Sequence, residues 1–148
     1  MSEPVQPRAK YPRLHLAFPV TDLTEARRFY GEFLDCPKSR SSPEWVDLDF
    51  YGHQIVAHKV ASGAMRDATR LIDSDQVPVR HFGVILSMSA WRELAAKLQA
   101  AKTKFVIELH VRFQGLAGER ATMFFLDPFG NALEFKAFEN IGQLFTRQ

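Results

Sequence analysis

Two histidines and one glutamate are the residues whose type and spacing point most directly to chemistry. His15 lies in the run PRLHLAF and His81 in the run PVRHFGV, 66 positions later, so each follows a proline and opens an apolar stretch. Glu134 stands in the run DPFGNALEF. Two imidazoles and one carboxylate form a mononuclear metal site with open coordination positions, which favours non-haem Fe(II), although Mn(II) tolerates the same ligands. We therefore expect these three residues to bind a metal ion.

Each of these residues also has an ordinary explanation. A single histidine in an apolar strand is most often a hydrogen-bonded core residue. Side chains alternate across a strand, so Glu134 points away from its neighbours Leu133 and Phe135. On a solvent face Glu134 is a surface acid, whereas inside a cavity its carboxylate needs a metal or a cation to offset the lost hydration. Two histidines at corresponding places in a repeat favour the metal.

The first unit of that repeat begins with a strand and a helix. Residues 14–20 predict an apolar strand. Asp22 with Glu25 resembles a capping box that begins a helix, and Pro37 prevents its continuation. Helical spacing predicts one buried face of this helix, made of Leu23, Ala26, Phe29, Tyr30, Phe33 and Leu34.

Three strands complete the first unit. We predict them at residues 38–42, 46–50 and 53–59. In the middle strand apolar residues alternate with Asp47 and Asp49, which is the period of a half-buried strand.

The second unit repeats this order. Residues 80–86 predict its opening strand, and Ser87 or Ser89 is expected to cap its helix. The helical stripe consists of Trp91, Leu94, Ala95, Leu98 and Ala101. The next strand is predicted to begin with residues 105–109, and residues 121–126 and 131–137 are predicted to form a hairpin.

A second match supports duplication. The run LDFYG at 48–52 matches LDPFG at 126–130 without a gap, 78 positions later. The second unit therefore carries twelve additional residues between its helix and its closing hairpin. We expect them at 111–120, where Gly115 and Gly118 indicate a loop.

On these residues the chain resembles the vicinal oxygen chelate superfamily, which includes glyoxalase I, type I extradiol dioxygenases and fosfomycin or bleomycin resistance proteins. The resemblance covers residues 14–137 and is most specific in the run FLDPFGNALEF. It implies an α+β fold of two βαβββ modules whose curled mixed sheets form a metal-binding cup. It also implies His15, His81 and Glu134 as the metal ligands. The run FYGHQIVAH further resembles a subgroup of small predicted extradiol dioxygenases.

One position departs from the glyoxalase I-like pattern. Aligning Gly52 with Gly130 places Val56 opposite Glu134, where such proteins carry a further acidic ligand. Three protein ligands leave room for a substrate that chelates through two oxygens and for dioxygen. The resemblance thus implies an Fe(II)-dependent, ring-cleaving dioxygenase acting on a small catechol-like substrate. Two alternatives stay open: a Mn(II) or Zn(II) lyase, isomerase or thiol transferase, and a metal-free protein that binds a flat drug-like molecule.

Further polar residues are candidates for the reaction. His58 shares a strand face with Val56, where it acts as an acid or base or, alternatively, faces water at the strand end. His110 and Arg112 adjoin the extra loop and either bind an anionic substrate or are solvated loop residues. His53 has the opposite parity to His58 and is expected to be structural.

Composition narrows the function classes. The formal net charge of +2, with cations spread along the chain, indicates neither a nucleic-acid nor a membrane partner. No apolar run approaches the roughly 20 residues needed to cross a bilayer. The single Cys36 excludes an intrachain disulfide, fits a reducing compartment and, just before Pro37 at a helix end, is a weak nucleophile. We expect a soluble cytoplasmic protein, and the resemblance implies a homodimer.

A chain of this length suits one domain. The expected organisation is a flexible lead-in at 1–11, a single domain at 12–140 and a tail at 141–148. Within the domain we expect module one at 12–60, a joining segment at 61–77 and module two at 78–138. The joining segment is either a lid or a passive linker.

Overall fold

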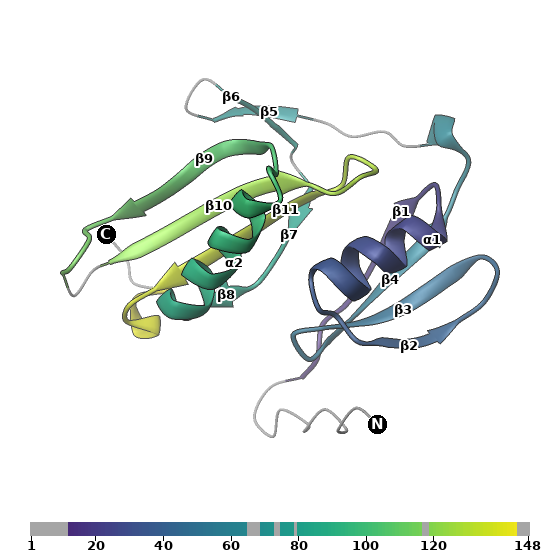
Figure 1. Ribbon diagram of the computed structural model, residues 1–148, viewed down its shortest axis with the longest axis horizontal. Coiled ribbons are helices and arrows are strands. Elements are labelled where there is room, and N and C mark those ends of the chain that lie inside the picture. Colours follow the sequence, from purple (N-terminus) through teal and green to yellow (C-terminus); the bar gives the residue numbers. More distant parts are fainter. Residues whose placement is uncertain (1–11, 65–68, 73–74, 79, 117–118, 145–148) are drawn as a thin grey trace. The chain divides into compact units, whose positions relative to one another are not determined.

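The protein divides into two compact units, Met1–Arg66 and Asp67–Gln148. The boundary falls inside the segment expected to join the modules. A computed structural model (Figure 1) describes residues 12–64, 69–72, 75–78, 80–116 and 119–144. The predicted lead-in at 1–11 and the last residues of the predicted tail lie outside the described residues.

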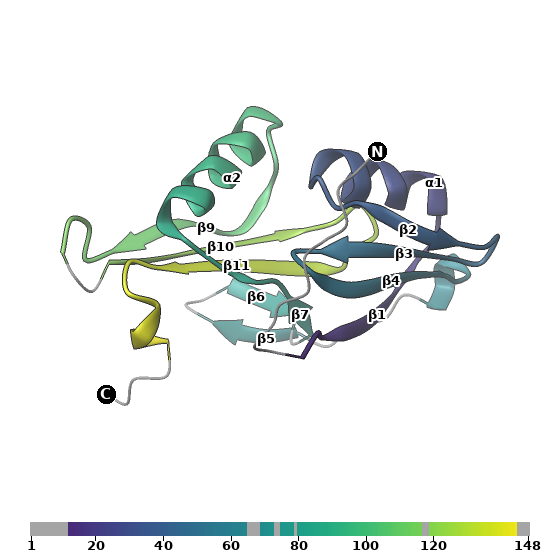
Figure 2. The same cartoon turned by 90° about the horizontal axis from the view of Figure 1, so that it is seen from below.

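Unit 1 has the predicted order of one strand, one helix and three strands. Its elements are β1 (His15–Val20), α1 (Leu23–Ala26) with a π-helical continuation (Arg27–Phe33), β2 (Lys38–Ser41), β3 (Trp45–Phe50), β4 (His53–Lys59) and a 3-10 turn (Ser62–Ala64). The four-stranded sheet has the order β1-β4-β3-β2. Strand β1 is parallel to β4, and the other pairs are antiparallel. Figure 2 shows α1 on one face of this open sheet.

The helix of unit 1 forms largely as its sequence predicts. The Asp22 carboxylate caps it by accepting a hydrogen bond from the Glu25 backbone N–H at 3.1 Å. The Glu25 side chain accepts from Arg28 Nε at 2.9 Å, so only the aspartate half of the capping box is seen to form. The predicted apolar face is buried except at Phe33, which is half-buried.

Unit 2 begins with an additional hairpin and then repeats the element order of unit 1, with its opening strand split in two. Its elements are β5 (Thr69–Ile72), β6 (Asp75–Pro78), β7 (His81–Phe82), β8 (Ile85–Leu86), α2 (Met88–Ala100), β9 (Phe105–Arg112), β10 (Arg120–Leu126), β11 (Ala132–Phe138) and a 3-10 turn (Ile141–Gln143). The main sheet has the order β7-β11-β10-β9, with β8 also pairing with β11. Both β7 and β8 run parallel to β11. The α+β fold of two βαβββ modules is therefore confirmed.

Several predicted boundaries in unit 2 are wrong. The strand predicted at 80–86 is interrupted between β7 and β8, where the backbone of Gly83 approaches β11 closely. A Cβ atom added at Gly83 would lie 1.6 Å from the Glu134 carbonyl oxygen, so this position requires glycine. Strand β9 continues to Arg112, into the loop predicted at 111–120, and the segment predicted to join the modules contains the β5–β6 hairpin.

The helix of unit 2 begins where predicted. Ser87 is its N-cap, and its hydroxyl accepts a hydrogen bond from the Ala90 backbone N–H at 3.2 Å. The predicted stripe is buried except at Ala101, which follows the last helical residue and is exposed. The Trp91 indole Nε1 donates to the Phe135 carbonyl at 3.1 Å and so holds α2 on the sheet. Figure 2 shows α2 on one face of its sheet.

The strand registers confirm the internal repeat. His15 is paired with Gln54 across the parallel strands of unit 1, and His81 is paired with Ala132 in unit 2. Both the 66- and the 78-position offsets of the sequence are therefore kept in the structure. The hairpin turns also agree, because Gly52 and Gly130 have φ angles of 86° and 90°.

Candidate metal centre

The predicted ligands lie on the sheet face opposite the helix in each unit. In β4 the buried Ile55 and Ala57 point to the helix side, so Gln54, Val56 and His58 point to the other side. Antiparallel neighbours share a face, which brings Asp47 to the same side as Val56.

In unit 2 the structure brings two of the three predicted ligands together. His81 Nε2 lies 3.1 Å from Glu134 Oε2. The other carboxylate oxygen, Oε1, accepts a hydrogen bond from the Thr122 hydroxyl at 2.9 Å. The Phe124 ring packs edge-on against the His81 imidazole, with ring centroids 4.9 Å apart. Both the histidine ring and the carboxylate are therefore held in fixed orientations.

This geometry fits a divalent metal ion. Two ligands at right angles, each about 2.1 Å from one metal, are roughly 3 Å apart. The observed 3.1 Å between His81 Nε2 and Glu134 Oε2 matches that separation. It also matches a hydrogen bond between the two groups in the absence of metal. Among the described residues, no three His, Cys, Asp or Glu side chains gather in one group. His81 and Glu134 are therefore the two candidate ligands that the structure brings together.

His15 belongs to unit 1 and has a different partner. Its Nδ1 lies 2.7 Å from Gln54 Oε1. Gln54 Nε2 in turn donates to Asp47 Oδ2 at 3.2 Å. Asp47 is only 6% exposed, although it alternates with apolar residues on a strand predicted to have a solvent face.

The other candidate residues lie farther along the strands. His58 is on the predicted face, but it pairs with Pro19. At about 3.3 Å per residue this puts it roughly 14 Å from His15. His110 and Arg112 lie on β9 and not in a loop, because β9 extends through both residues. His110 pairs with Thr122, on the same face as Glu134 and roughly 12 Å from it.

Two residues have structural roles. His53 Nδ1 accepts a hydrogen bond from the Leu14 backbone N–H at 2.9 Å, immediately before His15, which confirms the expectation that His53 is structural. Cys36 is 2% exposed, and its thiol contacts the Leu34 carbonyl at 3.7 Å. A buried thiol is inaccessible to substrates, in agreement with its predicted weakness as a nucleophile.

Sequence reasoning missed Thr122, Gln54 and Asp47, which contact the candidate ligands directly or through one other residue. Counting outward from each hairpin turn would have paired Asp47 with Val56 and put Thr122 two pairs from Glu134, on the same sheet face. That count needs the turn length, which is set by the Asp49 and Asp127 carboxylates. Asp49 accepts from Gly52 N at 2.7 Å, and Asp127 accepts from Asn131 N at 2.8 Å.

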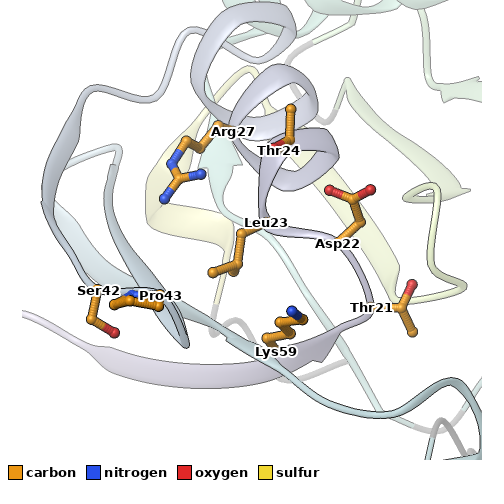
Figure 3. Close-up of a pocket in the computed structure, with 8 residues that line it drawn as sticks. All are labelled: Thr21, Asp22, Leu23, Thr24, Arg27, Ser42, Pro43 and Lys59. Carbon is orange, nitrogen blue, oxygen red and sulfur yellow. The ribbon is translucent and has the colours of Figure 1, made fainter.

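A separate polar pocket lies at the opposite end of β1 (Figure 3). Its volume is about 370 Å³, and it is lined by Thr21, Asp22, Leu23, Thr24, Arg27, Ser42, Pro43 and Lys59. None of the predicted site residues lines it. Thr21 lies six residue steps along the chain from His15, which is roughly 20 Å of extended strand. This pocket is therefore distinct from the candidate metal centre.

The glyoxalase/bleomycin resistance protein/dioxygenase superfamily model matches residues 13–135. A crystal structure of a glyoxalase/bleomycin resistance protein/dioxygenase from Alicyclobacillus acidocaldarius is 32% identical, with a TM-score of 0.72. That match covers 93% of this chain and 99% of the other. The chain belongs to this superfamily, as the resemblance in its sequence implied. Members are mostly enzymes that bind divalent metals and act on small molecules.

More distant structures share the fold. A fosfomycin resistance protein from Listeria monocytogenes has a TM-score of 0.65 at 16% identity, covering 86% of this chain and 93% of that one. A lactoylglutathione lyase from Agrobacterium tumefaciens has a TM-score of 0.63 at 17% identity, covering 95% and 100%. A search of curated proteins finds no match. Among the described residues, no helix is long and apolar enough to cross a membrane.

Proposed function

We propose that His15, His81 and Glu134 together bind one Fe(II) ion, and that the protein is a ring-cleaving dioxygenase of small catechol-like substrates. The observation that carries the proposal is the 3.1 Å separation of His81 Nε2 and Glu134 Oε2, which suits two ligands of one metal. His15 is the third ligand because it occupies the position in unit 1 that His81 occupies in unit 2. Two imidazoles and one carboxylate are the donor set of non-haem Fe(II) oxygenases.

The residues around the proposed ligands have different roles. Thr122 occupies one Glu134 oxygen and leaves Oε2 as the ligand atom. Phe124, only 2% exposed, packs against the His81 ring and limits its rotation. Val56 is the unit 1 counterpart of Glu134 and cannot bind a metal. Coordination positions on the metal would therefore stay open for oxygen atoms of the substrate and of dioxygen. The bound metal would supply a template for adjacent substrate oxygens and a path for electrons to dioxygen.

Three polar residues would contact the distal part of a substrate. His110 and Arg112 lie on the same sheet face as Glu134, and at roughly 12 Å His110 is outside the reach of a metal ligand. An anionic substituent away from the reacting ring is the group these two residues would bind. His58 lies too far along β4 for proton transfer beside His15, so we propose a substrate contact for it in place of acid–base catalysis.

Oxygen uptake with a panel of catechols tests this function, using protein loaded anaerobically with Fe(II). We expect uptake with wild type and none with Glu134→Ala. The Arg112→Ala variant serves as a control that should keep its iron. Stable binding of Mn(II) or Zn(II) with no oxygen uptake would replace this proposal with a lyase, isomerase or thiol transferase. Ligand binding without any metal would replace it with a sequestering protein.

We also propose a homodimer located in the cytoplasm. Analytical ultracentrifugation would test the dimer, with a single species of twice the chain mass as the expected result. A mixture of inactive His15→Ala and Glu134→Ala chains that regains metal would indicate that the modules complete the site across two chains. No recovery in a mixture that forms mixed dimers would indicate a site within one chain.

A further inference from the structure

We infer that Asp47 and Gln54 are positioning residues that fix the tautomer of His15, leaving its Nε2 atom unprotonated. The hydrogen-bond chain runs from the buried Asp47 carboxylate through the Gln54 amide to His15 Nδ1. The value of this arrangement for metal binding rests on the proposed function of His15.

Donor and acceptor identities determine the direction of the chain. An ionised carboxylate can only accept, so the Gln54 group facing Asp47 at 3.2 Å must be the NH2 end. The carbonyl end, Oε1, then faces His15 Nδ1 at 2.7 Å and can only accept as well. His15 Nδ1 must therefore carry the proton. A neutral imidazole has one N–H, which leaves the lone pair on Nε2.

Strand register makes this chain possible. Gln54 is directly paired with His15 across the parallel strands, so their side chains leave the sheet next to each other. Asp47 lies on the following strand, paired with Val56, whose apolar side chain offers no competing donor. Asp47 is 6% exposed, and a buried carboxylate needs such a donor to offset its lost hydration. The burial of Asp47 thus holds Gln54 in one orientation.

The second unit lacks this chain. The counterpart of Gln54 is Ala132, which is paired with His81 and carries no polar group. His81 instead directs Nε2 at Glu134. The tautomer relay is therefore a property of unit 1, where the carboxylate ligand is replaced by Val56.

Histidine tautomers can be read directly from 15N chemical shifts of metal-free protein. We expect wild-type His15 to show a protonated Nδ1 and an unprotonated Nε2. In Asp47→Asn the new amide can face Gln54 with either end, so Gln54 can turn over and the His15 signals become those of a tautomer mixture. The control Glu44→Gln makes the matched carboxylate-to-amide change at an exposed residue just before the same strand and should leave the His15 signals unchanged. Gln54→Leu should give the same mixture as Asp47→Asn.

Titration with Zn²⁺ or Mn²⁺ gives the second readout. Loss of a residue that hydrogen-bonds to and orients a metal ligand costs about 10- to 100-fold in metal affinity, so Asp47→Asn and Gln54→Leu should weaken binding by that factor. The control Glu44→Gln should change it less than about twofold. Thermal unfolding of each variant separates this effect from misfolding.

The outcomes distinguish the two proposals. Mixed His15 tautomers in wild type, or a fixed tautomer that survives in both Asp47→Asn and Gln54→Leu, would overturn the positioning role. A fixed wild-type tautomer that is lost in these variants would support it. If that result came with no metal bound to any form, the relay would stand and the proposed metal site would fall.

Discussion

The corresponding histidines of the two units, His15 and His81, use different ring nitrogens for their side-chain contacts. In unit 1, His15 uses Nδ1 to contact Gln54, and its Nε2 points elsewhere. In unit 2, His81 uses Nε2 to contact Glu134. The repeated fold places the two histidines identically, since each is paired with the corresponding residue of the neighbouring parallel strand. The difference therefore comes from the side chains around them.

Two exchanged residues explain the contrast. Unit 1 has Gln54 and Val56 where unit 2 has Ala132 and Glu134. In each unit one of these two positions is polar and the other apolar. His15 therefore contacts Gln54 on β4, and His81 contacts Glu134 on β11. Duplication of the fold thus preserved backbone register while the polar group moved by two residues along the strand. A repeat can keep its geometry and still divide chemical roles between its copies.

The largest expected effect is on metal binding. Glu134→Ala removes a proposed ligand, and we expect Zn²⁺ or Mn²⁺ affinity to fall more than about 100-fold, beyond the usual cost of losing a group that only orients a ligand. The matched change in unit 1, Val56→Ala, removes no ligand and should leave affinity within about threefold. Calorimetric titration measures both. Equal losses in the two variants would show that the units do not divide the roles as described.

A backbone contact provides the next test. Gly83→Ala forces a methyl group against the Glu134 carbonyl oxygen, 1.6 Å away without rearrangement. We expect a loss of about 3 kcal/mol in the free energy of unfolding, at the upper end of typical overpacking costs. Ala17 occupies the corresponding place in β1, and Ala17→Gly should cost at most about 1 kcal/mol. Urea unfolding measures both, and a harmless Gly83→Ala would contradict the close approach.

A smaller effect is expected from losing the Thr122 hydroxyl, which donates a hydrogen bond to Glu134. Thr122→Val removes the hydroxyl that holds Glu134 Oε1 at 2.9 Å. We expect metal affinity to fall about 10-fold, because the carboxylate gains freedom to rotate. Thr122→Ser keeps the hydroxyl and should bind as wild type does. If valine and serine behaved alike, the hydroxyl would have no part in orienting Glu134.

The smallest effect concerns the two hairpin turns, where Tyr51 corresponds to Phe129. Burial raises the pKa of Tyr51 to about 12, and nearby Cys36 and Asp35 add to the shift. The unfolded chain has a pKa near 10, so it releases this proton first and stability is lost as pH rises from about 10 to 12. Tyr51 is 36% exposed, so solvent screening limits the effect to about 1 kcal/mol or less. Tyr51→Phe, which copies unit 2, should flatten this part of the stability–pH curve.

Periodicity predicted the elements and the repeat because it reflects the burial of one helix face and one sheet face. It also put Glu134 opposite Leu133 and Phe135, as observed. It failed for Asp47, because alternation identifies a second face without telling whether that face is buried. Asp47 is buried there and is held by Gln54, a contact between strands that no local pattern contains.

Sequence patterns also could not predict where two backbone segments approach each other closely. The break at Gly83 depends on its distance from Glu134, which lies about fifty residues later and is fixed only by strand pairing. The extension of β9 to Arg112 has a similar cause. The pairing of His110 with Thr122 supplies hydrogen-bond partners that residues 110–112 lack by themselves, and this turned a predicted loop into an edge strand.

The most direct test of the central claim is the metal content of anaerobically purified wild type and of His15→Ala, measured by elemental analysis. The proposed reaction requires one metal shared by His15, His81 and Glu134. We predict about one iron per chain in wild type and almost none in His15→Ala, with unchanged thermal unfolding of the metal-free proteins. A His15→Ala chain that keeps its full metal content would contradict the account, because the metal would then be held without the first unit's histidine.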